Sequence, residues 1–436
     1  MRFVTVVRRQ ESSNCGAKGV NRAISVALAL LITPALHGYS VLTHEAIIDS
    51  AWDQNIKPLL LKRFPDATPD GLRKAHGYAY GGCIIQDMGY YPFGSKFFSD
   101  LLHYVRSGDF VANEIADSQD LNEYAFALGS LAHYAADNEG HRIAVNPSVG
   151  AEYPKLESQF GRDVTYADNP TAHLKVEFGF DVLQVSRGNY ASQSYRDFIG
   201  FQVSKELLDR AFRDTYGLEL KDVFTDVDLA LGAYRRAVSV IIPEMTRAAW
   251  SLNKKELAKA SLHVDRAKFV YNLSRASYEK SWGRTYQKPG IGARILGFFI
   301  RIVPKVGPFK AAAFKPPTPQ TAKWFEDSFD RALHDYRGLL AEAGNGNLRL
   351  ANMNFDTGEP AKPATYKLAD NAYAKLAVKL AGRDAGTVDA KVRAGILAFY
   401  RDLDLPFATK RDPKEWQKTV EAIGKLKAQA EDPALE

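Results

Sequence analysis

The chain has 436 residues and a formal net charge of +6 at pH 7, and 46% of its residues are hydrophobic. Residues 1–38 contain five basic residues and Glu11, so that segment carries +4 and the rest of the chain carries +2. So small a net charge gives no support to nucleic-acid binding through a basic surface. The two cysteines are Cys15 and Cys83, and only Cys83 lies beyond residue 38, which excludes an internal disulfide once that segment is removed.

Residues 1–38 have the order of features typical of a secretory signal peptide. Basic residues come first, an apolar run covers residues 23–32, and small residues follow up to Gly38. The apolar run is too short to span a membrane, which takes about 20 apolar residues. We therefore expect a secreted or periplasmic protein, in which bound metal would supply the stability that disulfides do not.

The remaining chain of roughly 400 residues is predicted to be all-α. Apolar residues recur at three- and four-residue spacing, without alternating strands and without an internal repeat. Glycine and proline cluster in residues 289–319, which predicts a division into an N-terminal part (39–283), a basic apolar linker (284–319) and a C-terminal helical region (320–436). The predicted helices are residues 43–52, 121–136, 172–185, 201–215, 225–252, 324–343, 366–380 and 389–401.

One predicted helix carries a pair of metal-ligand residues. His133 and Asp137 are four residues apart, so both side chains lie on one helix face and form a chelating pair. The next four-residue step leads to His141, where Gly140 is expected to let the backbone turn away from the helix axis. Imidazole combined with carboxylate suits zinc or a similar first-row metal better than calcium or magnesium.

Further candidates flank this helix in the sequence. His44 lies in an early helical turn, and Asp87 lies between glycines that suggest a loop in close backbone contact. His103 follows, and His173 with Glu177 forms a second pair one helical turn apart. His76, His263 and His334 have no partner at ligand spacing and are expected to be structural or solvated.

In this order the residues resemble the zinc-dependent phospholipase C family, whose relatives include the fungal single-strand-specific nucleases. The family pattern is an N-terminal Trp, a His, an Asp, a His, a His-x-x-x-Asp pair followed by a His, and a His-x-x-x-Glu or His-x-x-x-Asp pair. The similarity covers roughly residues 39–180, with Tyr39 in the place of the Trp. It implies a multi-helix phospholipase C/nuclease-like bundle with a trinuclear zinc site, followed here by additional C-terminal helices.

The resemblance also implies the ligands of three zinc ions and one catalytic residue. Asp87 is implied as a ligand and as the general base for the attacking water. Tyr39 is implied as a ligand through its free amino group and carbonyl, which requires cleavage after Gly38. The implied ligand sets are Asp87, His103, His133 and Asp137 for one ion, Asp137, His44 and Tyr39 for the second, and His141, His173 and Glu177 for the third.

Two segments bear on the substrate. Residues 284–315 contain seven Lys and Arg residues among many aliphatic and aromatic ones, and no acidic residue. Such a segment suits peripheral contact with a membrane interface, or alternatively a core helix with a solvated basic rim. Five aromatic residues between two predicted ligands could line a headgroup or base pocket or belong to the core: Tyr90, Tyr91, Phe93, Phe97 and Phe98.

The sequence as a whole predicts that residues 39–283 form the catalytic domain of an exported zinc-dependent phosphodiesterase. Its substrate would be a phospholipid, hydrolysed as by a phospholipase C through a water activated by metal. Two alternatives stay open: a zinc-dependent nuclease or 3′-nucleotidase with the same cluster, and a non-catalytic lipid-binding module with structural zinc. The small net charge makes nucleic acid the less expected substrate, and no protein partner is evident.

Overall fold

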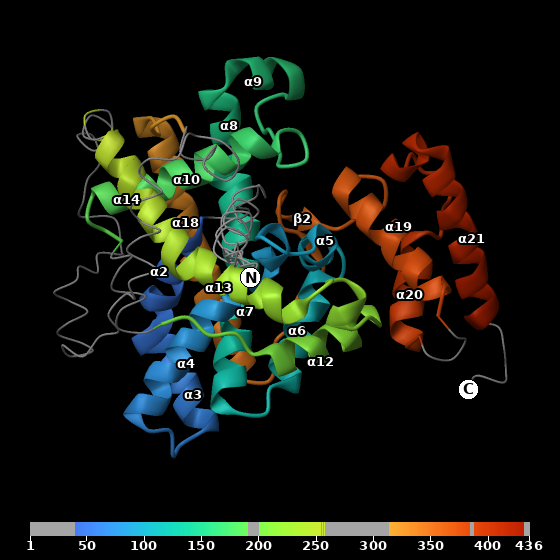
Figure 1. The fold of residues 1–436 in the computed structure, drawn as a ribbon, viewed down its shortest axis with the longest axis horizontal. Coiled ribbons are helices and arrows are strands. Elements are labelled where there is room, and N and C mark those ends of the chain that lie inside the picture. Colours follow the sequence, from blue (N-terminus) through green and yellow to red (C-terminus); the bar gives the residue numbers. More distant parts are fainter. Residues whose placement is uncertain are drawn as a thin grey trace, which may run out of the picture.

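The computed structural model describes residues 40–190, 200–253, 255, 257, 314–383 and 388–430, and these are mainly helical (Figure 1). The prediction of an all-α fold is therefore confirmed. Each predicted helix within the described residues has a helical counterpart, and the observed bounds differ from the predicted ones mostly at the ends. The N-terminal helices are α2 (Val41–Ala51), α3 (Lys57–Arg63), α4 (Pro69–Gly82), α5 (Lys96–Tyr104), α6 (Ser107–Asp117), α7 (Leu121–Gly140), α8 (Asn146–Glu152), α9 (Pro154–Phe160), α10 (Pro170–Ser186), α12 (Lys205–Tyr216), α13 (Val227–Arg236) and α14 (Ile242–Leu252).

Helix α7 lies near the centre of the molecule, between α4 and α18 (Pro319–Gly344) (Figure 1). The Asp120 side chain caps its start by accepting hydrogen bonds from the N–H groups of Asn122 and Glu123. Helices α4 and α7 cross closely, because a Cβ on Gly129 would lie 2.1 Å from the carbonyl oxygen of Ala79. Nearly every α7 residue is buried, so its polar side chains must be satisfied inside the protein.

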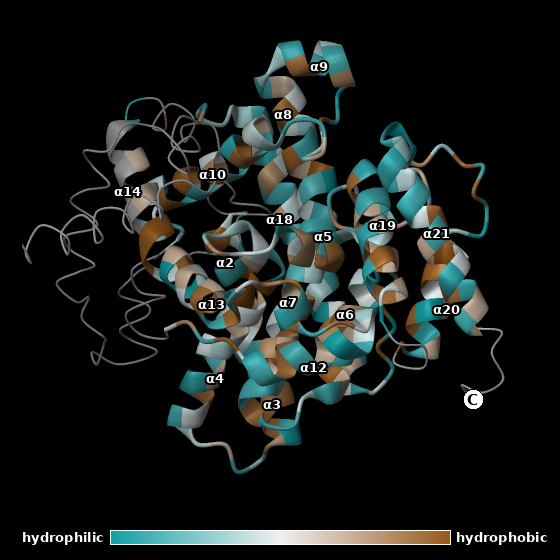
Figure 2. Ribbon diagram, turned by 45° about the vertical axis from the view of Figure 1, so that its right-hand side comes forward, coloured by the Kyte–Doolittle hydropathy of each residue, from teal (hydrophilic) through white to brown (hydrophobic). Residues whose placement is uncertain are grey.

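The C-terminal elements pack onto the same core. After α18, the strands β1 (Met353–Asn354) and β2 (Glu359–Pro360) pair antiparallel in a short hairpin. The helices α19 (Lys367–Ala381), α20 (Ala390–Phe399) and α21 (Pro413–Ala430) follow, and α19 packs against α5. One cluster of buried hydrophobic residues extends from α2 to α21. Figure 2 shows hydrophobic and hydrophilic residues alternating along α12 and α21, as expected for helices that cover a core with one face.

Two local predictions need correction. Gly140 has φ −64° and does not turn the chain away, because the helix continues through a π-helical turn, η3 (His141–Val145), into α8. Asp87 lies in a 3₁₀ helix, η2 (Ile85–Tyr90), rather than in an open loop. The close backbone contact expected there is present, since a Cβ on Gly89 would lie 2.0 Å from the carbonyl oxygen of Ser95.

Several predicted features lie outside the described residues: the signal peptide of residues 1–38, Tyr39, and residues 284–313 of the basic apolar segment. Phe314 and Lys315 are described; Phe314 is buried, whereas Lys315 is exposed. Phe314 is 5.8 Å from the ring of Phe178, and the Lys315 ammonium lies 4.4 Å from the ring centre of Tyr153. No helix among the described residues has the combination of length and apolar composition that crossing a membrane requires.

Candidate metal centre

Six elements bring the predicted ligands together at one end of α7. His44 comes from α2, Asp87 from η2 and His103 from α5, while η3 carries His141. Helix α7 provides His133 and Asp137, and α10 provides His173 and Glu177. Their ligand atoms form three buried groups, each within 4.8 Å: His44, His133 and Asp137; Asp87, His103 and His133; and His141, His173 and Glu177.

The imidazoles of His103 and His133 point at the same spot. Their Nε2 atoms are 3.4 Å apart. Each Nδ1 has a backbone acceptor, the carbonyl oxygen of Ser99 at 2.8 Å for His103 and that of Cys83 at 3.0 Å for His133. When Nδ1 donates to such a carbonyl in a neutral ring, Nε2 carries a lone pair. Two lone pairs facing each other repel unless a cation lies between them, so this geometry suits a metal ion.

The Asp137 carboxylate lies between two of the groups. Its Oδ1 is 3.4 Å from Nε2 of His44, and its Oδ2 is 3.0 Å from Nε2 of His133 and 3.6 Å from Nε2 of His103. The Asp87 Oδ1 approaches the same place and lies 3.3 Å from Nε2 of His103. The Oδ1 of Asp137 thus faces His44, and its Oδ2 faces His103 and His133. This is the arrangement of a carboxylate that bridges two ions.

Charge within this cluster is balanced between imidazoles and carboxylates. Burial opposes ionisation of Asp137, but the charges of His133 and His141 hold its pKa well below the usual range. Burial likewise disfavours the charged imidazolium, yet hydrogen bonding to Asp137 and Asp87 raises the pKa of His103 to about 10. Burial and the neighbouring His133 lower the pKa of His44. The carboxylates therefore favour a positive charge here, and a metal ion would take the place of the proton on His103.

The third group is built on η3 and α10. The Nδ1 of His141 lies 3.1 Å from the carbonyl oxygen of Phe355, which leaves Nε2 facing Glu177 Oε1 at 3.5 Å. The Nε2 of His173 is 2.8 Å from the same oxygen. Burial raises the pKa of Glu177 well above its usual value, and burial together with His141 lowers the pKa of His173 well below its own. Burial lowers the pKa of His141, but Asp137 and Glu177 raise it to about 9.

Unpaired buried atoms in these groups fit a metal ion. Among the described residues, Oε2 of Glu177 is buried without a hydrogen-bond partner, while Oε1 of Glu177 and Oδ1 of Asp87 face imidazole nitrogens of the same groups at 2.8–3.5 Å. Leaving such atoms unsatisfied is costly, and a cation would satisfy several of them at once. Zinc binds imidazole nitrogen and carboxylate oxygen in this way, so the donor set fits zinc.

His141 belongs to a different group from His133 and Asp137, although all three lie along one helix face, as their four-residue spacing predicts. The N–H of His141 bonds to the carbonyl oxygen of Asp137, so the α-helical position extends to His141, and the wider turn η3 begins there. His141 then meets Glu177 of α10, while Asp137 stays with His133.

The structure adds one acidic residue to the centre that the sequence did not indicate. Asp356 follows β1, and its Oδ1 lies 3.7 Å from Nδ1 of His141 and 3.9 Å from Nε2 of His173. Its sequence context, Asp-Thr-Gly-Glu-Pro, reads as a turn and has no ligand at metal-binding spacing. Only the tertiary fold brings it to the third group.

The other residues considered in the sequence have mixed placements. Tyr90, Tyr91 and Phe98 are buried, and Tyr90 lies 5.8 Å from the ring of His103, whereas Phe93 is 41% exposed. Most of the aromatic set therefore belongs to the core around the centre. His76 is structural, as expected, because it stacks on a tryptophan ring and lies 2.8 Å from Asp49.

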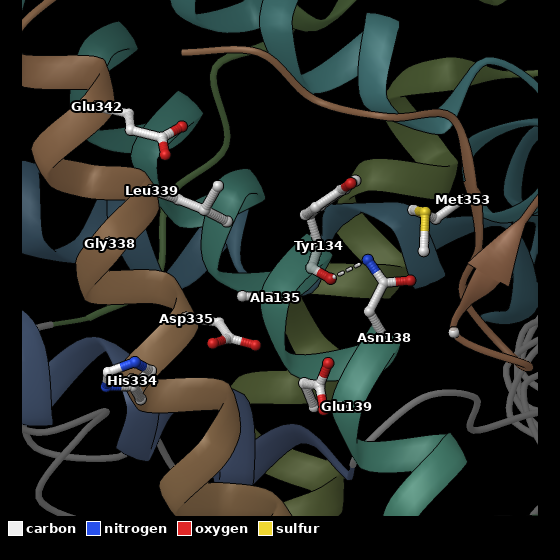
Figure 3. Close-up of a pocket in the computed structure, with 11 residues that line it drawn as sticks. Tyr134, Ala135, Asn138, Glu139, His334, Asp335, Gly338, Leu339, Glu342 and Met353 are labelled. Atoms are coloured by element: carbon white, nitrogen blue, oxygen red, sulfur yellow. Dashed lines mark hydrogen bonds between the residues drawn. The ribbon is translucent and has the colours of Figure 1, made fainter. Parts of the chain in front are cut away.

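A surface pocket of about 390 Å³ lies between α7 and α18 (Figure 3). Tyr134, Asn138 and Glu139 of α7 face it across from Asp335 and Glu342 of α18. These α7 residues alternate with His133 and Asp137 along the helix, and no predicted ligand is among the residues that line the pocket. The pocket is thus on a different side of α7 from the three groups of predicted ligands.

The protein is helical, and it contains three buried groups of histidines and carboxylates that could hold metal ions. Residues 43–226 match the family model described as zinc dependent phospholipase C. The resemblance to that family is therefore confirmed over this part of the chain, which includes every predicted ligand from His44 to Glu177, and it supports a phospholipase C-like hydrolase. No curated protein and no solved structure matches the chain.

Proposed function

We propose that this protein is an exported zinc-dependent phosphodiesterase that hydrolyses the glycerol-side phosphate ester of phospholipids. The observation that carries the proposal is the pair of Nε2 atoms of His103 and His133, 3.4 Å apart with the Asp87 and Asp137 carboxylates beside them. The family match supports the substrate class, since its description names a phospholipase C.

In this proposal, Asp87 and Asp137 have different roles in hydrolysis. Bound zinc would lower the pKa of water and neutralise negative charge on the phosphoryl oxygens. Asp87 is the proposed general base, because its carboxylate is buried and its Oδ1 faces the shared spot, 3.3 Å from Nε2 of His103. Asp137 keeps the imidazoles of His44, His103 and His133 oriented, and all of these side chains are shielded from bulk water.

Export and the zinc stoichiometry are part of the same proposal. Cleavage after Gly38 would make Tyr39 the first residue, five residues before His44 of α2, with its free amino group next to Ser40. That amine would complete the group of His44 and Asp137, giving three zinc ions in all. The basic apolar segment of residues 284–315 would contact the membrane that holds the substrate.

The test uses protein purified after export, with its N-terminus determined by sequencing. We expect it to begin at Tyr39 and to release phosphorylated headgroup from mixed phospholipid vesicles. EDTA should abolish the release and added zinc should restore it. His133→Ala should be inactive, whereas His76→Ala, which removes a buried histidine outside the three groups, should retain the zinc-dependent activity if it folds.

Single-stranded DNA and 3′-nucleotides are assayed on the same preparation. Turnover of these alone would replace the phospholipase proposal with a nuclease. Zinc-loaded protein that binds vesicles without turnover of any of these substrates would refute the enzyme proposal and favour a lipid-binding module.

A further inference from the structure

The start of α2 is capped by a side chain from another helix. Ser40 directly precedes α2, but its own side chain does not cap the first turn. The Oδ2 of Asp181, in α10, instead accepts the N–H of Leu42 at 3.0 Å, and its Oδ1 accepts the hydroxyl of Thr43 at 2.7 Å. Asp181 thus takes the part that an N-cap residue normally plays for its own helix, although 139 positions separate it from Leu42.

This cap is buried and is itself held in place. Asp181, Leu42 and Thr43 have no exposed surface. Because the single hydroxyl proton of Thr43 goes to Asp181, the hydroxyl of Tyr190 donates to Thr43, at 3.1 Å. The carboxylate also faces the positive end of the dipole of α2. Water does not compete for these bonds, so they fix the first turn of α2 to α10.

The capped turn leads directly to a predicted metal ligand. His44 follows Thr43 and is fully buried. Its Nε2 is 3.4 Å from Oδ1 of Asp137, and its ring stacks on that of His133 with the ring centres 4.6 Å apart. A metal ion needs its ligands within about 0.2 Å of fixed distances, so even a small movement of this turn would withdraw the imidazole.

We propose that Asp181 is a positioning residue for the metal ion held by the group of His44 and Asp137. By fixing the first turn of α2, it sets the place of His44 and of the amino group that the proposed cleavage would expose, one residue before Ser40. This role rests on the proposed function, because it requires that the group hold an ion. It adds a residue that touches neither the ion nor the substrate.

Helix α10 then serves two groups through one face. His173, Glu177 and Asp181 follow at four-residue steps, so they lie along the same side of the helix. The first two belong to the third group, whereas Asp181 acts through α2 on the group of His44 and Asp137. A substitution of Asp181 that merely disturbed α10 would therefore affect the third group first. This difference separates positioning from general structural support.

The test measures zinc affinities by competition with a fluorescent zinc chelator, on the full exported protein and without using activity. Wild-type protein should hold three ions. Asp181→Ala should weaken one of them by about 10-fold or more, since loss of an outer partner of a ligand typically costs about 10–100-fold. Asp181→Asn can still accept the N–H of Leu42 through its amide oxygen, so it should recover much of that affinity.

A second background identifies the ion that is weakened. His173→Ala protein is expected to keep only two ions, and adding Asp181→Ala should still weaken one of these. Asp120→Ala is the matched control, because it removes the cap of α7 at the helix end remote from His133. It should leave all three affinities unchanged.

Substitutions of Thr43 guard against an Asp181→Ala protein that fails to fold. Thr43→Val has nearly the same volume and removes only the bond to Oδ1 of Asp181, so it should weaken the same ion by a smaller factor. Thr43→Ser keeps the hydroxyl and should retain the wild-type affinity. Equal affinities in the Val and Ser variants would contradict the role of the cap.

The outcomes separate this role from the proposed function. Asp181→Ala protein that unfolds at a lower temperature but holds three ions with wild-type affinity would show a purely structural cap and overturn the inference alone. Weakening of the third ion only, with both ions of the His173→Ala background unaffected, would also overturn it. Wild-type protein that holds no zinc would overturn both the inference and the proposed function.

Discussion

The substitution Asp137→Asn tests whether one carboxylate joins two metal groups. Asparagine has nearly the same shape, so it opens no cavity, but it removes the negative charge that faces His44 through one oxygen and His133 and His103 through the other. Both groups should therefore lose affinity for zinc, while the group of His141, His173 and Glu177 keeps its ligands.

The expected size follows from linkage between binding and folding. An ion that binds only folded protein contributes about 4 kcal/mol when free zinc is roughly 1,000 times its Kd. Three such ions would contribute about 12 kcal/mol and one would contribute about 4 kcal/mol. With an unfolding entropy of about 2.1 cal/mol/K per residue over roughly 400 residues, 1 kcal/mol shifts Tm by about 1.2 °C. Zinc should therefore raise Tm by about 15 °C in wild-type protein and by about 5 °C in the variant.

The measurement is thermal unfolding in EDTA and in excess zinc, together with the zinc content of the dialysed protein. The zinc-dependent rise in Tm is compared, because the substitution also removes attractions that exist without metal. Asp49→Asn is the matched control, since Asp49 forms a buried pair with His76 at 2.8 Å that belongs to none of the metal groups. It should lower Tm by the same amount in EDTA and in zinc.

An Asp137→Asn protein that keeps the full zinc-dependent rise in Tm and three bound ions would refute the bridging role. A control variant with an equally reduced response would show that the effect is general destabilisation, and it would refute the argument in the same way.

Three further changes probe other parts of the structure. His173→Ala should release one zinc ion on dialysis and leave two, because His173 belongs only to the third group; loss of all three ions would contradict separate groups. Burial raises the pKa of Glu152 from 4.5 to about 8, so the stability from its protonated form is complete below pH 4.5 and is lost as pH rises through 8. Over that range the free energy of unfolding, measured with urea, should fall by at most about 5 kcal/mol more in wild-type protein than in Glu152→Gln, at 1.36 kcal/mol for each pKa unit. Parallel pH profiles for the two proteins would contradict this. Gly358→Ala should destabilise the protein by about 1–3 kcal/mol in chemical unfolding, since φ is +64° and the added Cβ would meet the backbone of Asn138; an unchanged midpoint would mean that the hairpin shifts freely.

Local spacing made much of the centre predictable from the sequence. His133 with Asp137, and His173 with Glu177, are each one helical turn apart, and a helix brings such residues together whatever the rest of the chain does. Helix α7 itself was predictable because its apolar residues recur at helical spacing. The order of His44, Asp87 and His103 carried the family resemblance, although their distances to α7 depend on tertiary packing.

The features of the centre that could not be predicted from the sequence depend on tertiary packing. Gly140 suggested a helix end, but the residues that follow are packed against α18 and α10, and their backbone groups remain paired in helical hydrogen bonds. Asp356 lies more than 200 residues from His141, in a turn sequence that occurs in many proteins. No periodicity connects the two, so only the folded hairpin reveals their contact.

The contacts of the hairpin also bear on where the catalytic unit ends. The matched family region stops at residue 226, and the division at residues 284–319 stays a prediction. Yet the backbone oxygen of Phe355 accepts the Nδ1 hydrogen of His141, and the Phe355 N–H donates to the carbonyl oxygen of His103. The hydroxyl of Tyr336 in α18 likewise donates to the backbone of α7 at Leu128. Because a metal-binding imidazole needs its second nitrogen held in place, the C-terminal part would position a ligand of the candidate metal centre. The centre is therefore completed by residues from both sides of the predicted linker.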